Sequence, residues 1–340
     1  MPPTYPPSDH YSNGRFFNPG VREHGFRELL KWTTNREPGL WRKHIPSVPG
    51  PKPEARVEGG ELRVTFIGHA TVLIQTEGLN LLTDPVFSER VSPVSFAGPR
   101  RHRAPGIRFQ DLPAIDVLLI SHNHYDHLDL PTLKKLVKRG QPAVFCPLGV
   151  ARILRRIGFQ AVTELDWGQS ALFRHIHLHC VRAQHFAART PFDRNRTLWC
   201  GWVAGFAAGN VYFAGDTGFG GFFEGIGERF RPIRLALLPI GAYRPEWFMG
   251  PVHMNPAQAV EVHRAIGAQT SVAIHYGTFS LADDGETEPV DALAVCLAEA
   301  RLAHPFLVLP EGEARVIPAV GTFEYCHTHR KFRYTSPRIR

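Results

Sequence analysis

A dense group of metal-binding side chains occupies residues 121–129, which read Ser-His-Asn-His-Tyr-Asp-His-Leu-Asp. Within six residues this stretch places His122, His124, Asp126 and His127. Neutral imidazole and carboxylate are ligands for zinc, iron and manganese. In an extended turn, the first two histidines can point to one side while the aspartate and the third histidine reach a second position. The spacing therefore predicts a metal site rather than a polar loop that happens to be rich in histidine.

The elements around this loop place it at the end of a buried strand. Residues 114–120 form an almost unbroken apolar run of strand length, which is typical of a strand buried on both faces. Pro131 fits the first turn of a following helix, and Asp129 is a candidate cap. Loops at the carboxyl ends of sheet strands usually carry function in α/β folds. The sequence therefore predicts a functional strand-to-helix loop.

The motif His-x-His-x-Asp-His after a hydrophobic strand resembles the signature of the metallo-β-lactamase-fold hydrolases. The longer string 122–129 is similar to the N-acylphosphatidylethanolamine-hydrolysing phospholipase D family, and segments 14–19 and 83–88 resemble it too. This resemblance covers roughly residues 62–315. It implies an α/β fold of the metallo-β-lactamase type, a four-layer αββα sandwich. The N-terminal 60 residues, the basic tail and the charges that follow Tyr243 depart from the family pattern.

The resemblance also implies a complete set of ligands for two metal ions. The expected ligands lie in the motif loop or at strand ends: His122, His124 and His185 for one metal, Asp126, His127 and His275 for the other, and Asp216 between them. Zinc is favoured by its affinity for imidazole and by the absence of a redox requirement, although manganese or iron would also suit these donors. The expected cofactor is therefore two Zn²⁺ per chain.

Further polar side chains are candidates near this centre. Asp84 ends a predicted strand, where it either orients a ligand imidazole or caps the turn before the following proline. In the resembling family the histidine at His253 lies close to the metals, so it is a candidate acid or oxyanion donor. Asp126 and Asp216 complete the candidate catalytic set. His69 is interpreted as a hydrogen-bonded structural histidine near the site.

An aromatic loop follows the predicted buried strand 235–240. Tyr243, Trp247 and Phe248 in this loop are expected to form the wall of a pocket for an apolar substrate, with packing beneath the loop as the alternative. A second loop, residues 87–105, has few periodic apolar residues and is expected to lie over one face as a lid. Its three clustered arginines are interpreted as solvated charge, with phosphate contact as the alternative.

Histidines also alternate with apolar residues over 172–181, which predicts one strand with a polar outer face. His175, His177 and His179 have no cysteine, aspartate or glutamate partners in this stretch. We therefore do not expect a second metal site here.

The chain of 340 residues is long enough for one large domain or two small ones. We expect a Pro-rich extension over 1–60, a hydrolase domain over 61–320 and a basic tail over 321–340. A short helix is expected over 21–32. It is interpreted as a strap packed on the main domain, with a basic and apolar membrane-surface helix as the alternative.

Composition narrows the partners and the compartment. The net charge of +8 favours acidic partners such as anionic lipid surfaces or phosphorylated substrates, and no nucleic-acid-binding motif is present, so nucleic acid is not expected. Five scattered cysteines without a Cys-x-x-Cys pair argue against a disulfide framework and against a thiolate zinc site. No apolar stretch approaches a membrane span and no signal peptide is recognisable. We expect a cytoplasmic protein, with peripheral binding to the inner face of an anionic membrane and a homodimer left open.

Together with the metal-binding motif, the resemblance implies a binuclear zinc-dependent hydrolase. The resemblance implies a phosphodiesterase of phospholipase D type that cleaves N-acylphosphatidylethanolamine-like lipids to N-acylethanolamine and phosphatidic acid through a metal-bridging hydroxide. A lactonase, an amidase or another metal-dependent hydrolase on the same fold is the first alternative. A non-catalytic metal- or lipid-binding protein is the second.

Overall fold

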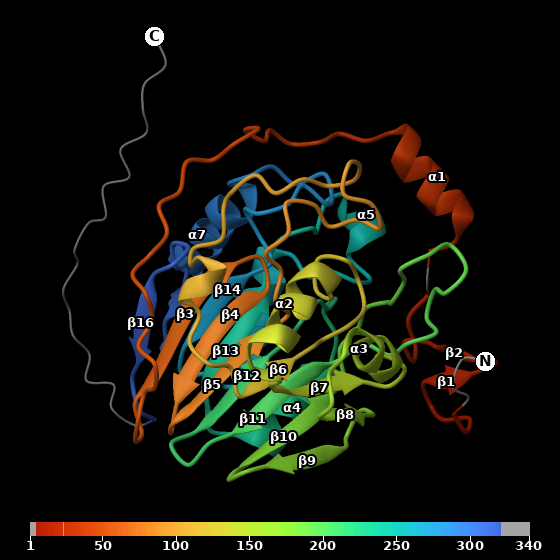
Figure 1. Cartoon of the computed structure of the whole chain (residues 1–340). Helices are drawn as coiled ribbons and strands as arrows, with labels where there is room; N and C mark the ends of the chain where they lie inside the picture. Colours follow the sequence, from red (N-terminus) through yellow and green to blue (C-terminus); the bar gives the residue numbers. More distant parts are fainter. Residues whose placement is uncertain (1–4, 23, 321–340) are drawn as a thin grey trace.

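The computed structural model describes residues 5–22 and 24–320, which form a layered α/β sandwich (Figure 1). Two seven-stranded sheets lie face to face in the centre, and helices cover their outer faces. This is the αββα arrangement expected from the sequence. The predicted basic tail, 321–340, lies outside the described residues.

The first sheet is half antiparallel and half parallel. In sheet order its strands are β16 (Ala314–Ile317), β3 (Leu62–Gly68), β4 (Thr71–Thr76), β5 (Leu79–Thr83), β6 (Val117–Leu119), β7 (Ala143–Pro147) and β8 (Val162–Leu165). The strands from β16 to β5 pair antiparallel, and those from β5 to β8 pair parallel. The parallel half delivers the carboxyl ends of β5 and β6 to the same edge, where the motif loop begins.

The second sheet repeats this mixture of directions. In sheet order its strands are β15 (Phe306–Leu307), β14 (Ser271–Ile274), β13 (Ile233–Pro239), β12 (Asn210–Phe213), β11 (Gly201–Gly205), β10 (Ile176–Val181) and β9 (Ser170–Phe173). Strands β9 to β12 are antiparallel, and β12 to β15 are parallel. The carboxyl ends of β12, β13 and β14 therefore also meet at one edge of the sheet.

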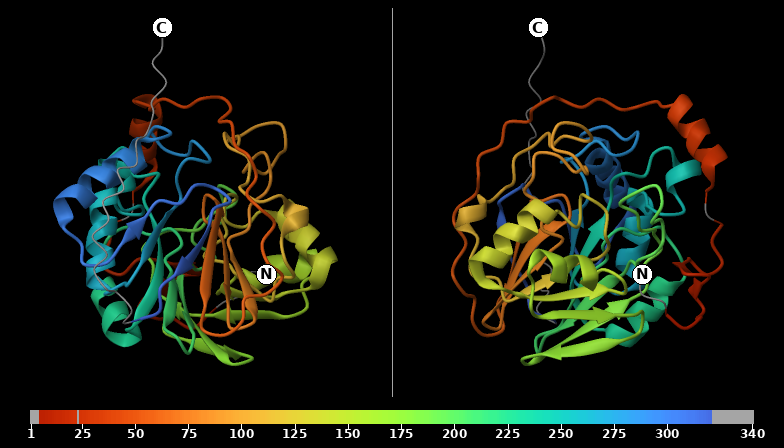
Figure 2. Two further views of the ribbon diagram at one scale, coloured as in Figure 1. Left: turned by 90° about the vertical axis from the view of Figure 1, so that its left-hand side faces the viewer. Right: turned by 45° about the vertical axis from the view of Figure 1, so that its right-hand side comes forward.

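Helices form the two outer layers (Figures 1 and 2). The helical elements are α1 (Phe26–Thr34), α2 (Leu130–Gly140), α3 (Ala151–Ile157), α4 (Phe222–Phe230), α5 (Glu246–Met249), α6 (Pro256–Ala265), α7 (Glu288–Ala300) and the 3₁₀ turn η1 (Phe109–Asp111). Asn255 caps α6 by accepting a hydrogen bond from the backbone N–H of Gln258, as its position before Pro256 indicates. A short hairpin, β1 (Tyr11–Ser12) with β2 (Arg15–Phe16), begins the described chain.

The hydrophobic core fills the space between the sheets and the space beneath the helices. On β4, Val72 and Ile74 belong to the cluster between the sheets, whereas Leu73 belongs to the cluster beneath α2 and α3. Because successive strand residues point to opposite faces, a strand with two buried faces needs a continuous apolar run. This requirement explains the unbroken apolar stretches of β4 and β6.

The stretch 172–181 forms parts of two antiparallel strands rather than one, so that prediction was wrong. The chain reverses at Arg174, which has a left-handed backbone with φ of 50°, and Leu172 pairs with His177 across the turn. His177 is exposed while its apolar neighbours on β10 are buried, in agreement with a polar outer face. Among the described residues, no group of three metal-binding side chains includes these histidines.

The last strand of the described chain, β16, lies in the first sheet, whereas β15 just before it belongs to the second sheet. Strand β16 crosses over and pairs antiparallel with β3, placing Ala314 opposite Thr65. Of the four residues of β16, only Ile317 is buried. A strand of four residues with one buried side chain is too short to show a periodic pattern, which is why the sequence did not predict it.

The predicted lid loop, 87–105, contains a buried arginine. Arg101 is 5% exposed and donates hydrogen bonds from Nη2 to the carbonyl oxygen of Val86 and from Nε to that of Ser88. Its guanidinium lies 4.8 Å from the ring centroid of Phe279. The interpretation of these arginines as solvated charge is therefore wrong for Arg101, which holds the loop in place.

The chain before β3 runs over the surface of the sandwich (Figure 2). Helix α1 begins at Phe26, later than expected, because Gly25 occupies the N-cap position, and it packs against α5. No residue of α1 is fully buried. Helix α1 therefore covers part of the domain without entering its core.

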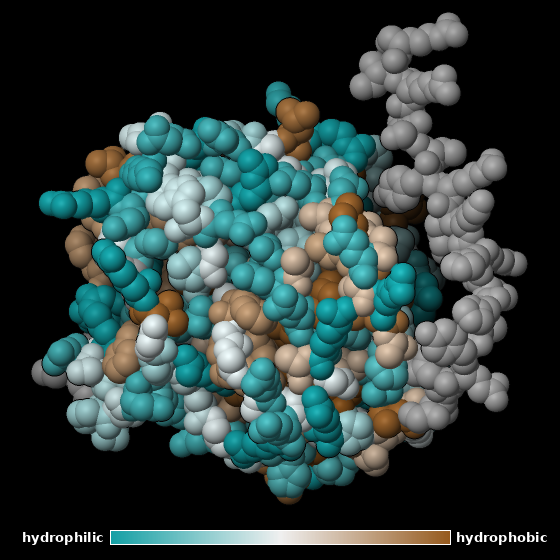
Figure 3. Space-filling model, turned by 180° about the vertical axis from the view of Figure 1, so that it is seen from behind, coloured by the Kyte–Doolittle hydropathy of each residue, from teal (hydrophilic) through white to brown (hydrophobic). Residues whose placement is uncertain are grey.

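The surface seen from behind is largely hydrophilic, with hydrophobic residues in small groups (Figure 3).

Over the part of the chain that the structure describes, none of the helices has the length and apolarity needed to cross a bilayer. The cysteines in this part of the chain are free thiols: Cys146, Cys180, Cys200 and Cys296.

Candidate metal centre

Three predicted imidazole ligands converge at the ends of two strands. His122 and His124 lie in the loop after β6, and His185 lies in the segment after β10. Nδ1 of His124 is 2.8 Å from Nε2 of His122 and 3.2 Å from Nε2 of His185. Three nitrogen atoms at this separation form a donor group that could hold one metal ion.

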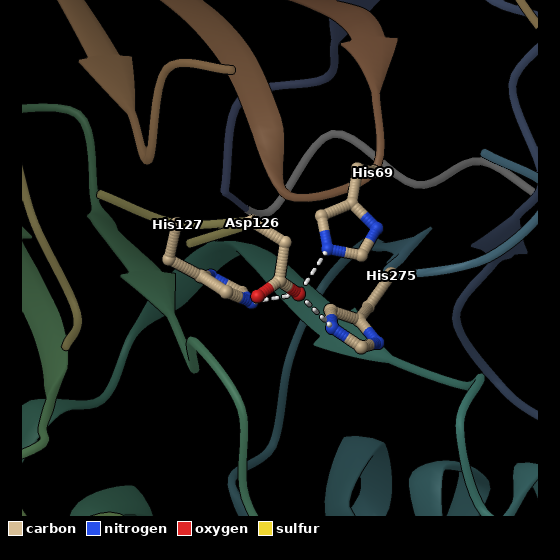
Figure 4. Close-up of side chains that lie close together, drawn as sticks. All are labelled: His69, Asp126, His127 and His275. Atoms are coloured by element: carbon tan, nitrogen blue, oxygen red, sulfur yellow. Dashed lines mark hydrogen bonds and ion pairs between the residues drawn. The ribbon is translucent and has the colours of Figure 1, made fainter. Parts of the chain in front are cut away.

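A second donor group lies beside the first (Figure 4). Oδ2 of Asp126 is 3.2 Å from Nε2 of His127 and 3.5 Å from Nε2 of His275, which follows β14. His69, in the turn between β3 and β4, places its Nε2 2.8 Å from the same oxygen. All four side chains point toward one another, so this group could also hold a metal ion.

Asp216 lies between the two groups. Its Oδ2 is 3.0 Å from Nε2 of His275, 3.1 Å from Nε2 of His127 and 3.8 Å from Nε2 of His185. The carboxylate thus reaches imidazoles of both groups, as a bridging ligand would. The structure therefore brings together all seven side chains that the resemblance implied as ligands.

Polar atoms that lack a hydrogen bond indicate that these residues fit divalent metal ions. Nε2 of His127, Nε2 of His275 and Oδ1 of Asp216 are buried and make no hydrogen bond of good geometry, although both nitrogen atoms lie close to carboxylate oxygens. Leaving a buried polar atom without a partner is unfavourable by about 1–3 kcal/mol. Because Nε2 of His127 and Nε2 of His275 face the carboxylate of Asp126 at the centre, metal coordination would satisfy them.

Burial and neighbouring charges separate the protonation states of the imidazoles. Burial lowers the pKa of His124 to about 4, and burial with neighbouring imidazoles holds the pKa of His122 and His185 well below the usual value. Burial alone would lower the pKa of His275 too, but Asp216 and Asp126 outweigh it and raise this pKa to about 9. The first group is therefore ready to coordinate a metal, whereas the second must release protons.

Contacts outside the centre orient three of the imidazoles through their Nδ1 atoms. Nδ1 of His127 lies 2.6 Å from Oδ2 of Asp84, and Nδ1 of His185 lies 2.9 Å from the carbonyl oxygen of Val252. Nδ1 of His122 lies 2.8 Å from Oγ of Ser121. With Nδ1 engaged in this way, each ring turns Nε2 toward the centre.

Asp84 is placed to orient His127 rather than to cap a turn. Its carboxylate is fully buried and accepts hydrogen bonds from the backbone N–H and from Oγ of Ser121, at 2.8 and 2.5 Å. Burial raises the pKa of Asp84, although its hydrogen bonds act in the opposite direction. Of the two roles considered from the sequence, the geometry favours the first.

His253 lies next to the centre on the loop before α6. Its ring centroid is 4.9 Å from that of His185 and 5.4 Å from that of His275. Its Nδ1 is buried without a hydrogen bond, and burial lowers its pKa to about 4. A neutral imidazole in this position can donate a hydrogen bond to a group bound at the centre.

A cavity of about 930 Å³ opens onto these side chains. It is lined by His253, by donors of both groups and by many apolar residues. Of the three aromatic residues proposed as its wall, Phe248 lines the cavity. Tyr243 lines a different hollow, with its hydroxyl 3.4 Å from Glu288, and Trp247 lies in a neighbouring hollow.

Sequence reasoning missed two contributions to the site. Residues of the N-terminal segment, among them Leu29 and Trp32, line the cavity. Arg189 also braces the motif loop, because its Nη1 donates to the carbonyl oxygens of Asn123 and Leu128 at 2.8 and 2.9 Å. Both depend on contacts between segments far apart in the chain, so no local pattern signals them.

Known proteins resemble this chain in sequence and in fold. The sequence model described as a beta-lactamase superfamily domain matches residues 79–276. N-acyl-phosphatidylethanolamine-hydrolyzing phospholipase D 1 of Caenorhabditis elegans is 44% identical over 238 residues, which cover 67% of this chain and 66% of the worm protein. The mitochondrial N-acyl-phosphatidylethanolamine-hydrolyzing phospholipase D of Saccharomyces cerevisiae is 33% identical over 242 residues, or 69% of this chain and 51% of the yeast protein.

These matches span just under two thirds of the worm protein and about half of the yeast protein. Among solved structures, Igni18, described as a metallo hydrolase from Ignicoccus hospitalis, matches with a TM-score of 0.58 at 21% identity. This match covers 76% of the present chain and 99% of Igni18. At that identity, the likeness shows the fold.

Proposed function

The chain belongs to the β-lactamase superfamily and has the fold of its metal-dependent hydrolases, and we propose that it is a binuclear zinc phosphodiesterase of phospholipase D type. Its substrate would be an N-acylphosphatidylethanolamine-like lipid, and its products would be an N-acylethanolamine and phosphatidic acid. The observation that carries this proposal is one apolar cavity that ends on two adjoining groups of metal donors. The identity to the worm and yeast phospholipases supports the choice of reaction.

The predicted ligands divide between two metal ions. His122, His124 and His185 would hold one, Asp126, His127 and His275 the other, and Asp216 would contact both. When bound, two divalent cations at such a site activate a water molecule for attack and neutralise charge on phosphoryl oxygens. The imidazole-rich donor set suits zinc, and manganese or iron would be accepted on the same grounds.

The chain's own residues orient the ligands and stabilise the leaving group. Asp84 accepts the Nδ1 proton of His127 and so keeps the Nε2 lone pair of that ring available. His253, with a pKa lowered to about 4 by burial, is neutral near pH 7. It therefore acts as a neutral N–H donor toward the leaving or phosphoryl oxygen rather than as a charged acid.

The cavity suits a lipid phosphodiester better than a small cyclic substrate. Its volume of about 930 Å³ lies near the upper end of the range of ligand pockets, which is roughly 300–1,000 Å³. Phe248 and Leu29 give it apolar walls, and Arg194 also lines it, with a guanidinium 4.3 Å from the ring centroid of Phe186. An apolar wall together with a cation matches an acyl chain attached to a phosphate.

Hydrolysis of N-acylphosphatidylethanolamine in mixed micelles tests this proposal. The zinc-loaded wild type is expected to release N-acylethanolamine, whereas Asp126→Asn should lose at least about a hundredfold in turnover because it removes the charge of a ligand. Asp291→Asn, on the exposed side of α7, is the matched control and should retain full turnover. Metal content is measured for each variant.

The alternatives give different results in the same experiment. If the wild type binds two metals per chain but releases no N-acylethanolamine, the phospholipase D assignment is wrong. Activity on a lactone, amide or β-lactam in a parallel panel would then identify another hydrolase on this fold. A metal-replete protein inert toward the whole panel would favour a binding protein.

A further inference from the structure

The N-terminal segment supplies one wall of the active-site cavity. Val21, His24, Phe26, Leu29 and Trp32 line it together with the metal donors. All five precede residue 79, where the match to the superfamily model begins. This wall therefore lies outside the residues that the superfamily model matches, and it belongs to the same cavity as the metal donors.

Aromatic contacts join this wall to the loop after β13. The ring of Trp32 lies 5.0 Å from that of Phe248, with an angle of 23° between the planes, and the ring of His24 lies 5.2 Å from Phe248 at 22°. The ammonium group of Lys31 is 4.6 Å from the ring centroid of Trp247. Helix α1 and α5 thus share a stacked aromatic surface.

A buried carboxylate fixes the position of Trp32. Asp283 is 2% exposed, and its side chain accepts hydrogen bonds from Nε1 of Trp32 at 3.2 Å, from Nε of Arg36 at 2.7 Å and from the backbone N–H of Glu37 at 3.2 Å. The guanidinium of Arg36 lies 4.7 Å from the ring centroid of Trp32. A carboxylate is rarely buried unless it is paired and hydrogen-bonded, so this clamp defines one position for the helix.

Two of the pocket-facing residues of α1 are exposed. Phe26 is 76% exposed and Leu29 is 42% exposed, although both line the cavity. Leu281 and Ala282, which precede the clamping Asp283, form the adjoining wall. An apolar channel that runs from an uncovered helix to a polar metal centre matches a molecule with a long apolar chain and a charged head.

We propose that α1 is the chain-length selector of the active site. Trp32, Leu29 and Phe26 would contact the distal part of one acyl or alkyl chain of a phosphate-containing amphiphile, and Asp283 would hold Trp32 in the position that makes this contact. The identification of the amphiphile as a substrate rests on the proposed function. The subsite itself rests only on the cavity and on the clamp.

Kinetics with N-acylphosphatidylethanolamines of increasing N-acyl length test the selector. In the wild type, KM is expected to fall as the chain lengthens, by about threefold to fourfold per methylene until the cavity is filled. Trp32→Ala should raise KM about tenfold to a hundredfold for long chains and much less for the shortest chain, so that KM depends less on chain length than in the wild type. Trp32→Phe keeps an aromatic ring but loses the hydrogen bond to Asp283. Its KM values should lie between those of the wild type and those of Trp32→Ala.

Trp41→Ala is the matched control. Trp41 lies on the same surface segment and donates a hydrogen bond from Nε1 to the carbonyl oxygen of Asp284, but it does not line the cavity. Its chain-length profile should be that of the wild type. Circular dichroism and metal content establish that each variant is folded and loaded.

Binding of single-chain alkylphosphocholines below their micelle concentration separates the two proposals. By calorimetry, affinity for the wild type and for Trp41→Ala is expected to rise with alkyl length, and this rise should be much smaller for Trp32→Ala. If no lipid is hydrolysed but this difference is seen, the proposed function fails while the selector stands.

Unchanged chain-length profiles and unchanged binding slopes in Trp32→Ala would overturn the selector even if the wild type is an active phospholipase. Sedimentation with anionic vesicles gives one more discrimination. If Trp32→Ala loses vesicle binding while its chain-length dependence stays that of the wild type, α1 is a membrane-surface helix instead.

Discussion

Nε2 of His69 lies 2.8 Å from Oδ2 of Asp126, and both side chains are buried. His69 also contacts the centre through its backbone, because its carbonyl oxygen accepts a hydrogen bond from the backbone N–H of His275 at 2.8 Å. It adopts a left-handed conformation with φ of 58°. One residue of the turn after β3 thus contacts two predicted ligands of the same metal.

This relationship predicts that His69 sets the affinity of the second metal site. His69→Ala should lower the affinity for one of the two metal ions by about tenfold to a hundredfold, because Asp126 loses the group that orients it. Titration against a chromogenic chelator measures both affinities separately. His69→Asn is the companion variant, since asparagine tolerates the left-handed backbone. Two metals bound by His69→Ala with wild-type affinity would contradict this role.

Asp84 is predicted to act on the same site through a different ligand. Asp84→Asn replaces the acceptor for Nδ1 of His127 with an amide and should lower metal affinity by about tenfold to a hundredfold. Asp129→Asn is the control, because this buried carboxylate contacts Ser88 and Thr132 rather than the centre. We expect Asp129→Asn to lower the melting temperature while metal affinity is retained. Equal loss of metal in both variants would show that Asp84 acts only on stability.

Metal binding should release protons at neutral pH. In the metal-free protein the pKa of His275 is raised to about 9, mainly by Asp216 and Asp126 acting against burial, and that of His127 is raised well above its usual value. Both imidazoles are therefore protonated at pH 7 and must become neutral to coordinate. Affinity should fall by about tenfold per pH unit below pH 9 through protonation of His275, and more steeply once His127 is protonated as well. Calorimetry in buffers of different ionisation enthalpy counts the protons, and a count of zero at pH 7 would exclude this mechanism.

The sequence predicted the parts of the site that depend on local order along the chain. The motif loop after β6 follows from a buried apolar run, which is a strong signal, whereas Asp216 and His275 were expected as ligands because their strand ends resemble those of the family. The wall formed by Trp32 was not predicted, because its contacts with Phe248 and Asp283 join segments far apart in the sequence. Nothing within a helix of so few residues indicates which of its faces will close a cavity.

The same contrast explains the errors in the fold. The break at Arg174 depends on one residue taking a left-handed backbone that its type does not favour. Strand β16 was missed because it is an edge strand with a single buried residue. Edges and reversals are decided by tertiary pairing, whereas the central strands are decided by their own hydrophobicity.

The last prediction concerns a charged histidine that ties the N-terminal hairpin to the domain. Nε2 of His10 lies 2.7 Å from Asp166, Nδ1 lies 2.5 Å from Asp9, and the ring stacks on Trp167 at 4.4 Å. Burial lowers the pKa of His10, but the two carboxylates outweigh it, so the folded-state pKa is raised above 6.5. A raised pKa means that the stability contributed by His10 is fully present below about pH 6.5 and is lost as the pH rises through the folded-state value.

The loss of free energy of unfolding caused by His10→Gln should therefore be largest below about pH 6.5 and should shrink at alkaline pH. Urea unfolding of both proteins at several pH values measures this difference, and NMR titration of His10 gives its pKa directly. His177→Gln, at an exposed position of β10, is the control and should show a small difference at every pH. A difference for His10→Gln that stays constant across the pH range would mean that neutral packing on Trp167, rather than the charge, anchors the hairpin.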